Sequence, residues 1–539
     1  MILTFAMLSL LLSAPLQAAD ALPESRDSLG RGKLTGSIES NTVRYFDDPV
    51  IGLPAHSWGS NNYLKLDWQR DSLSAGLQAE WYPEALAGYP SELKGAGITG
   101  LWLSWLHGPL ELTAGSFHEQ LGAGLVLRTW EDRDMGINNC LTGARARLHT
   151  AAVDLTLLGG LPKYGLWPTL QSAVAGADAA VRLLPETSEH SLSLEASLLD
   201  RISSGTDPGI EVLARAGGFS VPGQVLSWSG RISYAWRGFS LKGEYAGKGA
   251  DFYTEQLPKA HERYVLKGGN AQLLEMNYAA GGFSGTVTLR RLENMSSRIL
   301  LTTGSTSVAN TLNYLPSLCM QQSYLLAGLN PYVTLADGEA GLQGDLYYRF
   351  RKGTPLGGRY GMKVHVGGSW IEGLPCALPD REASHLAYRD INIDVERRWN
   401  RNFRTILFVS IQECSPTHGN RKATDAQNVF VLDGLYRFSR TASARLELQY
   451  LYSQELTRDW MAALLELSFA PHWSITVSDM YNHGSTGVHY YNIGASYSLS
   501  ALSVSLLAGR NREGMVCSGG VCRWQPAWSG AGLRVQWSF

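Results

Sequence analysis

Hydrophobic and polar residues alternate with a period of two along most of the chain. In residues 531–539, Ala, Leu, Val, Trp and Phe alternate with Gly, Arg, Gln and Ser. Residues 73–82, 191–198 and 445–452 repeat this pattern. A period of two is that of a β-strand with one apolar face and one polar face. The sequence therefore predicts an all-β fold.

About 24 such strands, within a range of roughly 22 to 26, fit between residues 35 and 539. They have the ~10-residue length with which a tilted strand crosses a membrane. Beyond the amino terminus, no segment supplies the ~18 consecutive apolar residues of a membrane-spanning helix. Strands that cross a membrane must close into a barrel, because lipid leaves an open edge without hydrogen-bond partners.

The connections between the predicted strands alternate in length. Tight turns fall at residues 71–72, 237–238 and 281–282. Between them lie longer connections, among them 118–140, 201–226, 249–269 and 294–340. Short turns on one rim and long loops on the other are typical of outer-membrane barrels, whose short side is periplasmic. We expect a transmembrane antiparallel up-and-down barrel with long extracellular loops; a secreted soluble β-protein is the alternative.

The composition excludes several other classes. Charged residues make up 17% of the chain, below the ~25% of ordinary soluble proteins. With 46 basic and 48 acidic residues, the net charge of −2 gives no positive field for a nucleic acid. Of the basic residues 35 are Arg and 11 are Lys, which favours fixed ion pairs in enclosed places. We expect no nucleic-acid partner.

The sequence contains no strong catalytic or metal-binding motif. No Gly-x-Ser-x-Gly sequence stands at a predicted strand-to-helix turn. His118-Glu119 lacks the second His that a zinc-protease helix requires. We expect neither an enzyme nor a metal or other cofactor.

The amino terminus predicts export from the cytoplasm. Residues 2–12 are apolar and are followed by small residues up to Ala18 and Ala19, as in a secretory signal peptide. A buried first strand or helix is the alternative, since no Lys or Arg precedes Arg26. The predicted organisation is a signal peptide at 1–18, a short periplasmic segment at 19–34 and one barrel domain at 35–539, located in a bacterial outer membrane.

Six cysteines lie in or beside the long connections. In an exported protein this position favours disulfides over thiol catalysis or zinc binding. Cys517 and Cys522 form the strongest predicted pair, because Gly519 and Gly520 allow a tight turn between them.

The other cysteines are assigned on weaker grounds. Cys376 and Cys414 lie in consecutive long connections and form a second predicted pair. Elimination then leaves Cys140 with Cys319, a pairing that rests on arithmetic and not on geometry.

The connection 118–140 has the densest mixture of glycine and charge in the chain. If it folds into the lumen, its charged residues can form a constriction that filters solutes, as charged rings do in pores. The alternative is a loop tethered to the wall by ion pairs. The candidate residues are Arg128, Glu131, Asp132, Arg133 and Asp134.

Aromatic residues gather near the ends of the predicted strands. Amphipathic rings favour the boundary between membrane and water, and sugar stacking in a binding site is the alternative role. The tryptophans of this group include Trp68, Trp81, Trp102, Trp105, Trp236, Trp370 and Trp473.

Three segments resemble a family of outer-membrane barrels of unknown function from Bacteroidota-type bacteria. They are residues 62–67 (NYLKLD), 119–128 (EQLGAGLVLR) and 517–523 (CSGGVCR). In addition, Trp537 and the terminal Phe539 resemble the carboxyl-terminal signal that barrel-assembly machinery recognises. The resemblance implies an exported single barrel and no particular substrate.

A barrel of about 24 strands is too wide to be filled by its wall side chains alone. The segment before the first strand is too short for a plug domain, so infolded loops, chiefly 118–140 and 294–340, are the available filler. We expect a passive or gated channel in contact with outer-membrane lipid. The alternative is a surface scaffold that docks a lipoprotein or a secretion-system partner through its disulfide-stabilised loops.

Overall fold

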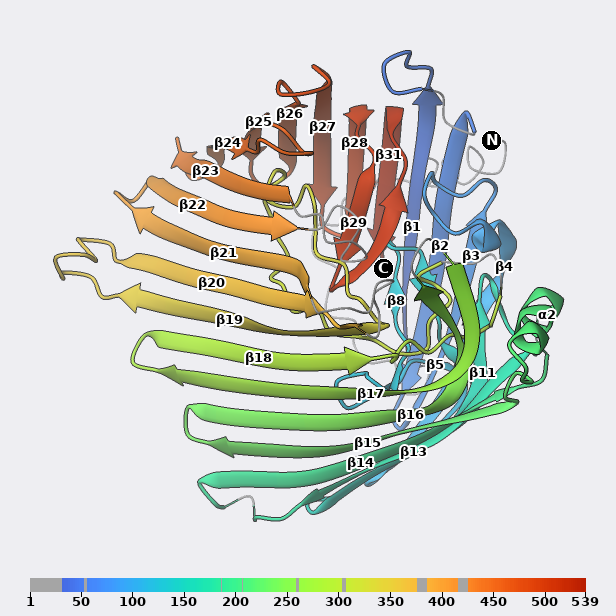
Figure 1. Cartoon of the computed structure of the whole chain (residues 1–539). Coiled ribbons are helices and arrows are strands. Elements are labelled where there is room, and N and C mark those ends of the chain that lie inside the picture. Colours follow the sequence, from blue (N-terminus) through green and yellow to red (C-terminus); the bar gives the residue numbers. More distant parts are fainter. Residues whose placement is uncertain are drawn as a thin grey trace.

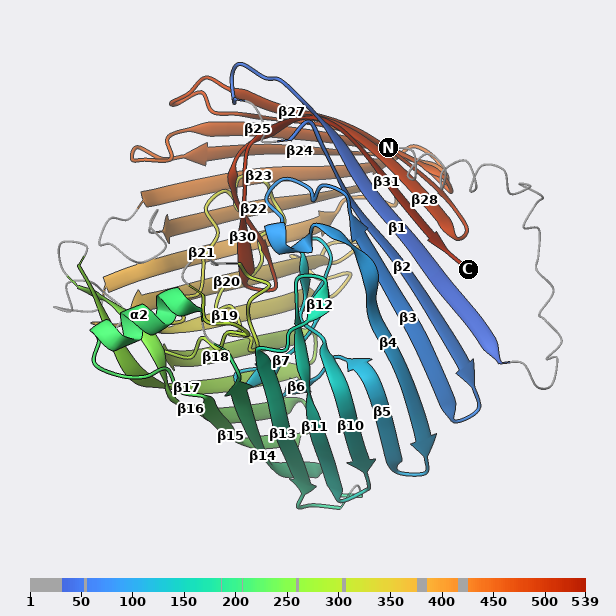
Figure 2. The same ribbon diagram turned by 90° about the vertical axis from the view of Figure 1, so that its right-hand side faces the viewer.

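The computed structural model describes residues 32–52, 56–185, 187–205, 207–257, 261–302, 307–375, 385–414 and 425–539. Within them, 24 antiparallel strands form one closed barrel (Figures 1 and 2). Each strand pairs with its neighbours in chain order, and the barrel closes where β1 pairs with both β2 and β31. The predicted all-β barrel and its strand count are confirmed. The signal peptide and most of the predicted segment 19–34 lie outside the described residues.

The barrel strands are β1 (Lys33–Phe46), β2 (Trp58–Arg70), β3 (Leu73–Tyr82), β4 (Gly95–His107), β5 (Leu110–Phe117), β10 (Leu141–His149), β11 (Val153–Tyr164), β13 (Ser172–Arg182), β14 (His190–Ser203), β15 (Gln224–Trp236), β16 (Phe239–Leu257), β17 (His261–Ala280), β18 (Phe283–Glu293), β19 (Gly338–Phe350), β20 (Met362–Gly373), β21 (His385–Arg398), β22 (Phe403–Cys414), β23 (Asp425–Arg437), β24 (Ala442–Tyr452), β25 (Trp460–Phe469), β26 (Trp473–Tyr481), β27 (His489–Leu499), β28 (Leu502–Asn511) and β31 (Trp528–Ser538). The connections contain η1 (Ser91–Leu93), β12 (Trp167–Pro168) and α2 (Pro208–Ala216).

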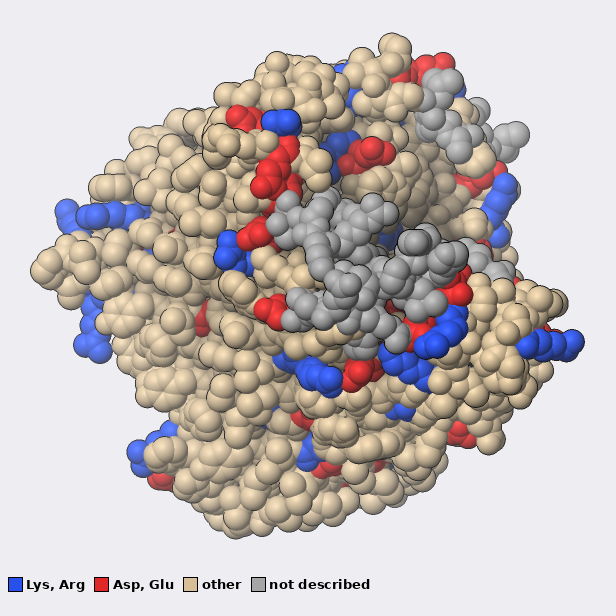
Figure 3. All heavy atoms as spheres, in the orientation of Figure 1, with Lys and Arg blue, Asp and Glu red and all other residues tan. Residues whose placement is uncertain are grey.

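The alternation along each strand separates an outer face from a lumenal face. In β22, Leu407, Val409 and Ile411 are 38–56% exposed on the outside. The residues between them, such as Phe408 and Ser410, are buried inside the barrel. The outer wall is therefore largely apolar, and charged side chains gather toward the rims and the mouth (Figure 3). A contiguous apolar surface of this extent is typical of a membrane or protein interface.

Most short turns and long connections lie on opposite rims, as the sequence predicted; the connections 351–361 and 183–189 are longer exceptions on the short rim. Two-residue turns of this kind need backbone conformations with positive φ. Asp71 and Arg237 adopt them at φ of 50° and 49°, and Gly281 at 60°. Such turns hold neighbouring strands in register on one rim and leave the long connections to the other.

Two features of the long rim differ from the prediction. The connection expected at 249–269 is mostly strand, because β16 and β17 continue into a long hairpin that rises above the rim (Figure 1). The rings of Phe252 and Tyr264 stack across this hairpin with centroids 6.0 Å apart. The connection 201–226 contains α2, which begins where Asp207 accepts a hydrogen bond from the Gly209 amide at 2.7 Å. The Asp-Pro start of a helix is a recognisable signal.

Candidate functional site: the loop-filled lumen

Three segments from the long rim fold into the barrel and together form what we call the plug. The first plug loop (118–139) contains β6 (Gln120–Leu121), β7 (Leu127–Arg128), β8 (Glu131–Asp132) and β9 (Ile137–Asn138). The second plug loop is 294–337, described except for 303–306. The plug hairpin consists of β29 (Gly514–Ser518) and β30 (Val521–Gln525). Figure 2 shows β6, β7 and β30 within the outline of the barrel.

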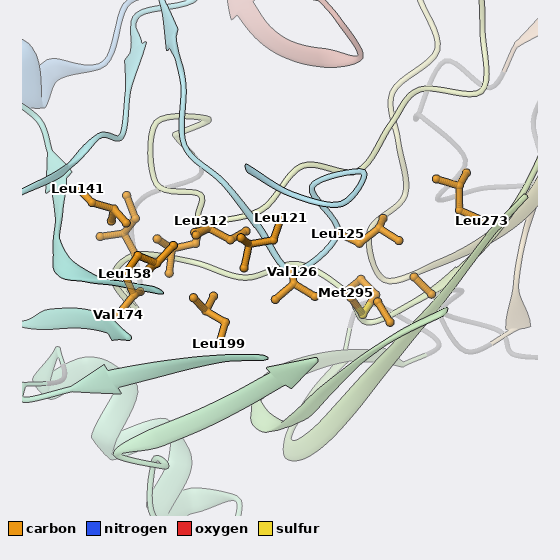
Figure 4. Packing of buried hydrophobic residues seen from close by; sticks show 14 of the residues in the cluster. Leu121, Leu125, Val126, Leu141, Leu158, Val174, Leu199, Leu273, Met295 and Leu312 are labelled. Carbon is orange, nitrogen blue, oxygen red and sulfur yellow. The ribbon is translucent and has the colours of Figure 1, made fainter. Parts of the chain in front are cut away.

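Leucine-rich contacts seat the first plug loop against one side of the lumen (Figure 4). Leu121, Leu125 and Val126 are at most 2% exposed and pack in one cluster with wall residues such as Leu158 and Leu199. Each fully buried side chain of this size contributes roughly 1.5–3 kcal/mol. The lumenal wall is apolar here because a loop, and not water, covers it.

The second plug loop has its own apolar seat on the other side of the lumen. Tyr324, Leu326 and Leu329 pack in a cluster with Phe408 and Val431 of the wall. The amide of Leu326 also donates to Gln449 Oε1 at 2.9 Å. The loop is thereby fixed to β22, β23 and β24.

Asn313 joins the two plug loops. Its Nδ2 donates to the carbonyl oxygens of Leu125 (2.9 Å) and Met295 (2.7 Å). Its Oδ1 accepts from the Ser297 amide at 3.0 Å. Asn313 is 4% exposed, so these three backbone groups depend on one side chain for their hydrogen bonds.

Two of the predicted constriction residues bind the wall. The Arg133 guanidinium lies 3.0 Å from Glu39 Oε2 of β1 and 2.9 Å from Glu131 Oε1. Glu131 Oε1 also accepts from Gln78 Nε2 of β3 at 2.8 Å. This part of the first plug loop is tied to the wall on the side opposite its leucine-rich seat.

The other three residues lie in different surroundings. Arg128 stacks over the Tyr314 ring of the second plug loop, 4.0 Å from its centroid. Asp132 accepts from the Met135 amide at 3.0 Å within its own loop. Asp134 is 3.5 Å from Arg534 of β31. The five charges therefore lie within one loop but do not all face one another across a pore.

One fully enclosed ion pair of the lumen was not predicted from the sequence. Lys163 Nζ of β11 lies 2.7 Å from Glu80 Oε1 of β3, and both side chains are at most 1% exposed. Glu80 also accepts from Tyr82 (2.9 Å) and Thr99 (2.8 Å). Three strands separate β3 from β11 along the wall, so no local pattern connects the two residues.

Two cavities remain between the first plug loop and the wall. One, of about 420 Å³, is lined by Lys65, Trp102, Glu111 and Arg145 among others. The other, of about 430 Å³, lies beside Arg231, Lys242 and Glu275 among others. Both sizes fall within the ~300–1,000 Å³ of small-molecule sites, and both linings carry charges of either sign. The filled lumen therefore still contains polar space.

The side chain of Trp102 lies inside the barrel and not at the membrane–water boundary, where the sequence placed it. Trp102 lies between Leu101 and Leu103, which are 63% and 52% exposed on the outer face. Its side chain therefore points into the lumen, where Lys65 Nζ lies 5.6 Å from its ring. Trp105, three residues further along, is exposed on the outer face instead.

The predicted disulfide between Cys517 and Cys522 is present and joins β29 to β30. Gly519 and Gly520, both at positive φ, form the turn between them. The Tyr314 hydroxyl donates to the Gly519 carbonyl oxygen. The disulfide thus braces a hairpin that contacts the second plug loop.

The predicted pairing of Cys140 with Cys319 is wrong, because both are free thiols. Cys140 directly follows the first plug loop and Cys319 lies in the second, and burial raises their pKa values to about 11 and about 12. Elimination failed here because it assumed that every cysteine is oxidised. Cys414 is also a free thiol, and its predicted partner Cys376 lies outside the described residues.

The last residue continues the hydrogen-bond ladder at the closure of the barrel. The Phe539 amide donates to the Gly36 carbonyl oxygen at 2.9 Å, and the Gly36 amide donates back at 2.8 Å. The rings of Trp537 and Phe539 lie with centroids 4.9 Å apart. Phe539 is 48% exposed, so its ring is accessible at the short-turn rim.

No helix in the described ranges has the length and apolar character to cross a membrane. Within the same ranges, no group of three or more His, Cys, Asp or Glu side chains is arranged to hold a metal ion. Fold and site together define the class of this protein: a closed 24-stranded β-barrel whose lumen is filled by its own loops.

The chain belongs to a family of unknown function, DUF6029, which matches residues 1–539. The predicted membership in an uncharacterised family is thus confirmed over the whole chain, whereas the Bacteroidota origin stays a prediction. No curated protein matches the chain.

Several solved barrels have similar architecture. The siderophore receptor PirA from Pseudomonas aeruginosa is 11% identical over 94% of this chain and 80% of its own, with a TM-score of 0.40. The P pilus usher PapC translocation pore is 9% identical over 94% and 99%, with a TM-score of 0.36. The copper transporter OprC is 9% identical over 94% and 81%, with a TM-score of 0.42. At these scores none of the similarities carries an argument about function.

Proposed function

We propose that this protein is an outer-membrane barrel that acts as a gated channel, with the plug as its gate. The observation that carries the proposal is that the lumen of a 24-stranded barrel is occupied by folded loops that leave polar cavities. Loops held by separate, breakable contacts can move, whereas a wall sealed by its own strands cannot. The substrate remains open in this proposal, and catalysis is not part of it.

The outer face supports the membrane location. Large apolar side chains such as Leu101, Leu407 and Ile493 are 55–63% exposed around the barrel. Water disfavours so large an apolar surface, while hydrocarbon accommodates it. We place the short turns in the periplasm and the plug loops toward the cell exterior, as in other barrels of this type.

Removal of the second plug loop tests the channel proposal. The amides of Asn294 and Met295 donate to the carbonyl oxygens of Asp337 and Ala336, each at 3.1 Å, so the β18–β19 ladder continues into the base of the loop. An Asn-Gly turn can therefore replace residues 296–335 without a change of register. Single-channel recording in planar bilayers should give low or no conductance for the intact barrel and large steady conductance for the deletion variant.

A matched control removes a connection that is not part of the plug. The Ser203 amide donates to the Gly223 carbonyl oxygen at 2.8 Å, so an Asn-Gly turn can replace residues 204–222, including α2. This control should conduct like the intact barrel. No conductance from the folded plug-loop deletion, or equal conductance from both deletions, would remove the basis of the gate.

The alternative role as a surface scaffold has less support. It required disulfide-stabilised loops that are free to dock a lipoprotein or a secretion-system partner. The Cys517–Cys522 hairpin instead contacts the second plug loop through Gly519 and Tyr314. These contacts favour a role inside the barrel.

A further inference from the structure

Exposed cations gather on three successive turns of the short rim, between β19 and β20, β21 and β22, and β23 and β24. Segments 349–361, 397–405 and 436–444, which contain these turns, have no Asp or Glu. In the part of the chain that the structure describes, none of the cations contacts a carboxylate. The exposed members of this basic rim are Arg349, Arg351, Lys352, Arg359, Arg398, Arg401, Arg437 and Arg440.

The pairing of strands adds to the excess of positive charge. Arg398 of β21 stands directly opposite Arg404 of β22 in the antiparallel register, and both have the lumenal parity of Phe408, so this pair adds positive charge at the inner edge of the rim and not on its lipid-facing side. Like charges in this arrangement destabilise a sheet unless an anion neutralises them. Elsewhere on the short rim the protein supplies its own anion, because Arg237 lies 3.2 Å from Glu189. The basic rim lacks such a partner and is therefore suited to an external anion.

Aromatic rings lie on the outer face of the same strand ends. Trp399, Tyr436 and Phe438 are 44–63% exposed, and the Arg397 guanidinium lies 4.6 Å from the Trp399 ring. Exposed amphipathic rings at strand ends mark the level of the membrane–water boundary. The cations of the adjoining turns then lie at the level of the lipid headgroups. Figure 3 shows basic side chains along the left edge of the molecule, where the left ends of β19–β23 lie in Figure 1.

The apolar outer wall continues from this aromatic band toward the middle of the barrel. A groove of about 730 Å³ on the outer face of β22 to β27 is lined in mid-wall by residues such as Leu407, Phe430 and Leu448, and it extends to Tyr481 and His489 at the long-rim ends of β26 and β27. Leu407, Phe430 and Leu448 are 46–56% exposed. An acidic protein at the short rim would use the cations but not this apolar surface, whereas a phospholipid would use both.

We propose that the basic rim binds the phosphate groups of anionic phospholipids in the leaflet that meets the short turns. This inference rests on the membrane location proposed above, and it is independent of whether the lumen conducts. It also assigns an orientation: the side of the barrel formed by β19–β24 collects anionic lipid, while the opposite side does not.

Native mass spectrometry of the full-length barrel in a neutral detergent tests this proposal. The purified barrel is titrated with palmitoyl-oleoyl phosphatidylglycerol or with the zwitterionic phosphatidylcholine of the same chains. Each basic residue at a membrane surface contributes about fivefold to the binding of anionic lipid. The combined substitution Arg351→Gln, Arg359→Gln, Arg401→Gln and Arg440→Gln removes four exposed arginines of the turns. It should weaken phosphatidylglycerol binding by roughly a hundredfold or more and leave phosphatidylcholine binding unchanged.

The matched control is Arg237→Gln, which removes an arginine from the same rim whose charge Glu189 already neutralises. It should alter phosphatidylglycerol binding less than about threefold, because no free charge is lost. A shift in electrophoretic mobility on heating shows that each variant is folded. Addition of 0.5 M NaCl, which shortens the Debye length to a few ångströms (about 4 Å), should reduce the preference of the intact barrel.

Three results would overturn the inference. These are equal binding of the two lipids by the intact barrel, undiminished phosphatidylglycerol binding by the fourfold variant, or binding of a poly-glutamate peptide at the rim in place of lipid. If the intact barrel needs detergent but binds the two lipids equally, only the lipid-binding inference is refuted. A chain that stays monomeric in buffer without detergent removes the membrane location as well.

Discussion

Replacement of Asn313 by leucine should loosen the junction between the two plug loops. Leucine has a similar volume, so the packing changes little, but three hydrogen bonds of 2.7–3.0 Å are lost. Each buried backbone group left without a partner costs about 1–3 kcal/mol. Only the bond to Leu125 joins the two loops, because Met295 and Ser297 belong to the same loop as Asn313. A cost of about 1–3 kcal/mol for that bond corresponds to roughly a fivefold to hundredfold increase in the population of the open plug.

Hydrogen exchange followed by mass spectrometry measures this population directly. Peptides covering 118–130 should exchange at least about fivefold faster in Asn313→Leu, whereas peptides of β24 should not change. The matched control is Asn310→Leu: Asn310 is also buried, but its two hydrogen bonds go to the backbone of Leu300 in the same loop. If the first plug loop exchanges at the intact rate in Asn313→Leu, or equally fast in both variants, Asn313 does not join the loops.

Three further predictions concern the wall, the thiols and the terminus. Lys163→Met should lower the free energy of unfolding by about 3–5 kcal/mol, because it leaves Glu80 charged and buried. Adding Glu80→Gln should recover much of this loss, as measured by urea unfolding midpoints. Absence of recovery would contradict the pairing. Burial raises the pKa values of Cys140 and Cys319 to about 11 and about 12, so both thiols should resist iodoacetamide at pH 8 until urea unfolds the barrel. Their contribution to the free energy of unfolding should fall as the pH rises from about 9 through these pKa values. Rapid labelling of the folded chain would refute this prediction. Phe539→Ser should lower the yield of heat-modifiable barrel in cells. It should change the free energy of unfolding of the refolded barrel by less than about 0.5 kcal/mol, because the backbone pairing of residue 539 remains. A comparable loss of yield and of stability would assign the ring a purely structural role.

The sequence was sufficient for the wall of the barrel. Each strand has one face toward the outside and one toward the lumen, so the sequence of each strand alternates with a period of two. The alternating segment 73–82, for example, has the same bounds as β3. Trp102 shows how the same rule corrects an error: its parity with Leu101 and Leu103 places it inside, whereas its position near a strand end had suggested the outside.

The plug could be predicted only in part. Loops 118–140 and 294–340 were expected as filler because a barrel this wide leaves an unfilled lumen. Their contacts were not predictable, since Asn313 reaches Leu125 across 188 residues and Lys163 reaches Glu80 across 83. No periodic pattern encodes such pairs. The apolar residues within 121–127 were the available signal, because leucines in a glycine-rich loop need a buried partner surface.

The two sides of the first plug loop are held by different forces, and this difference gives the proposed gate a direction. Leu121 and Leu125 sit in an apolar cluster, whose stability depends little on ionic strength. On the opposite side Arg133 is held by Glu39, and Asp134 by Arg534. These ion pairs are partly exposed and are therefore screened by salt. Release should begin on the β1–β31 side and leave the loop hinged on its leucine-rich seat, which is the movement expected of a gate that reopens and closes without losing its place.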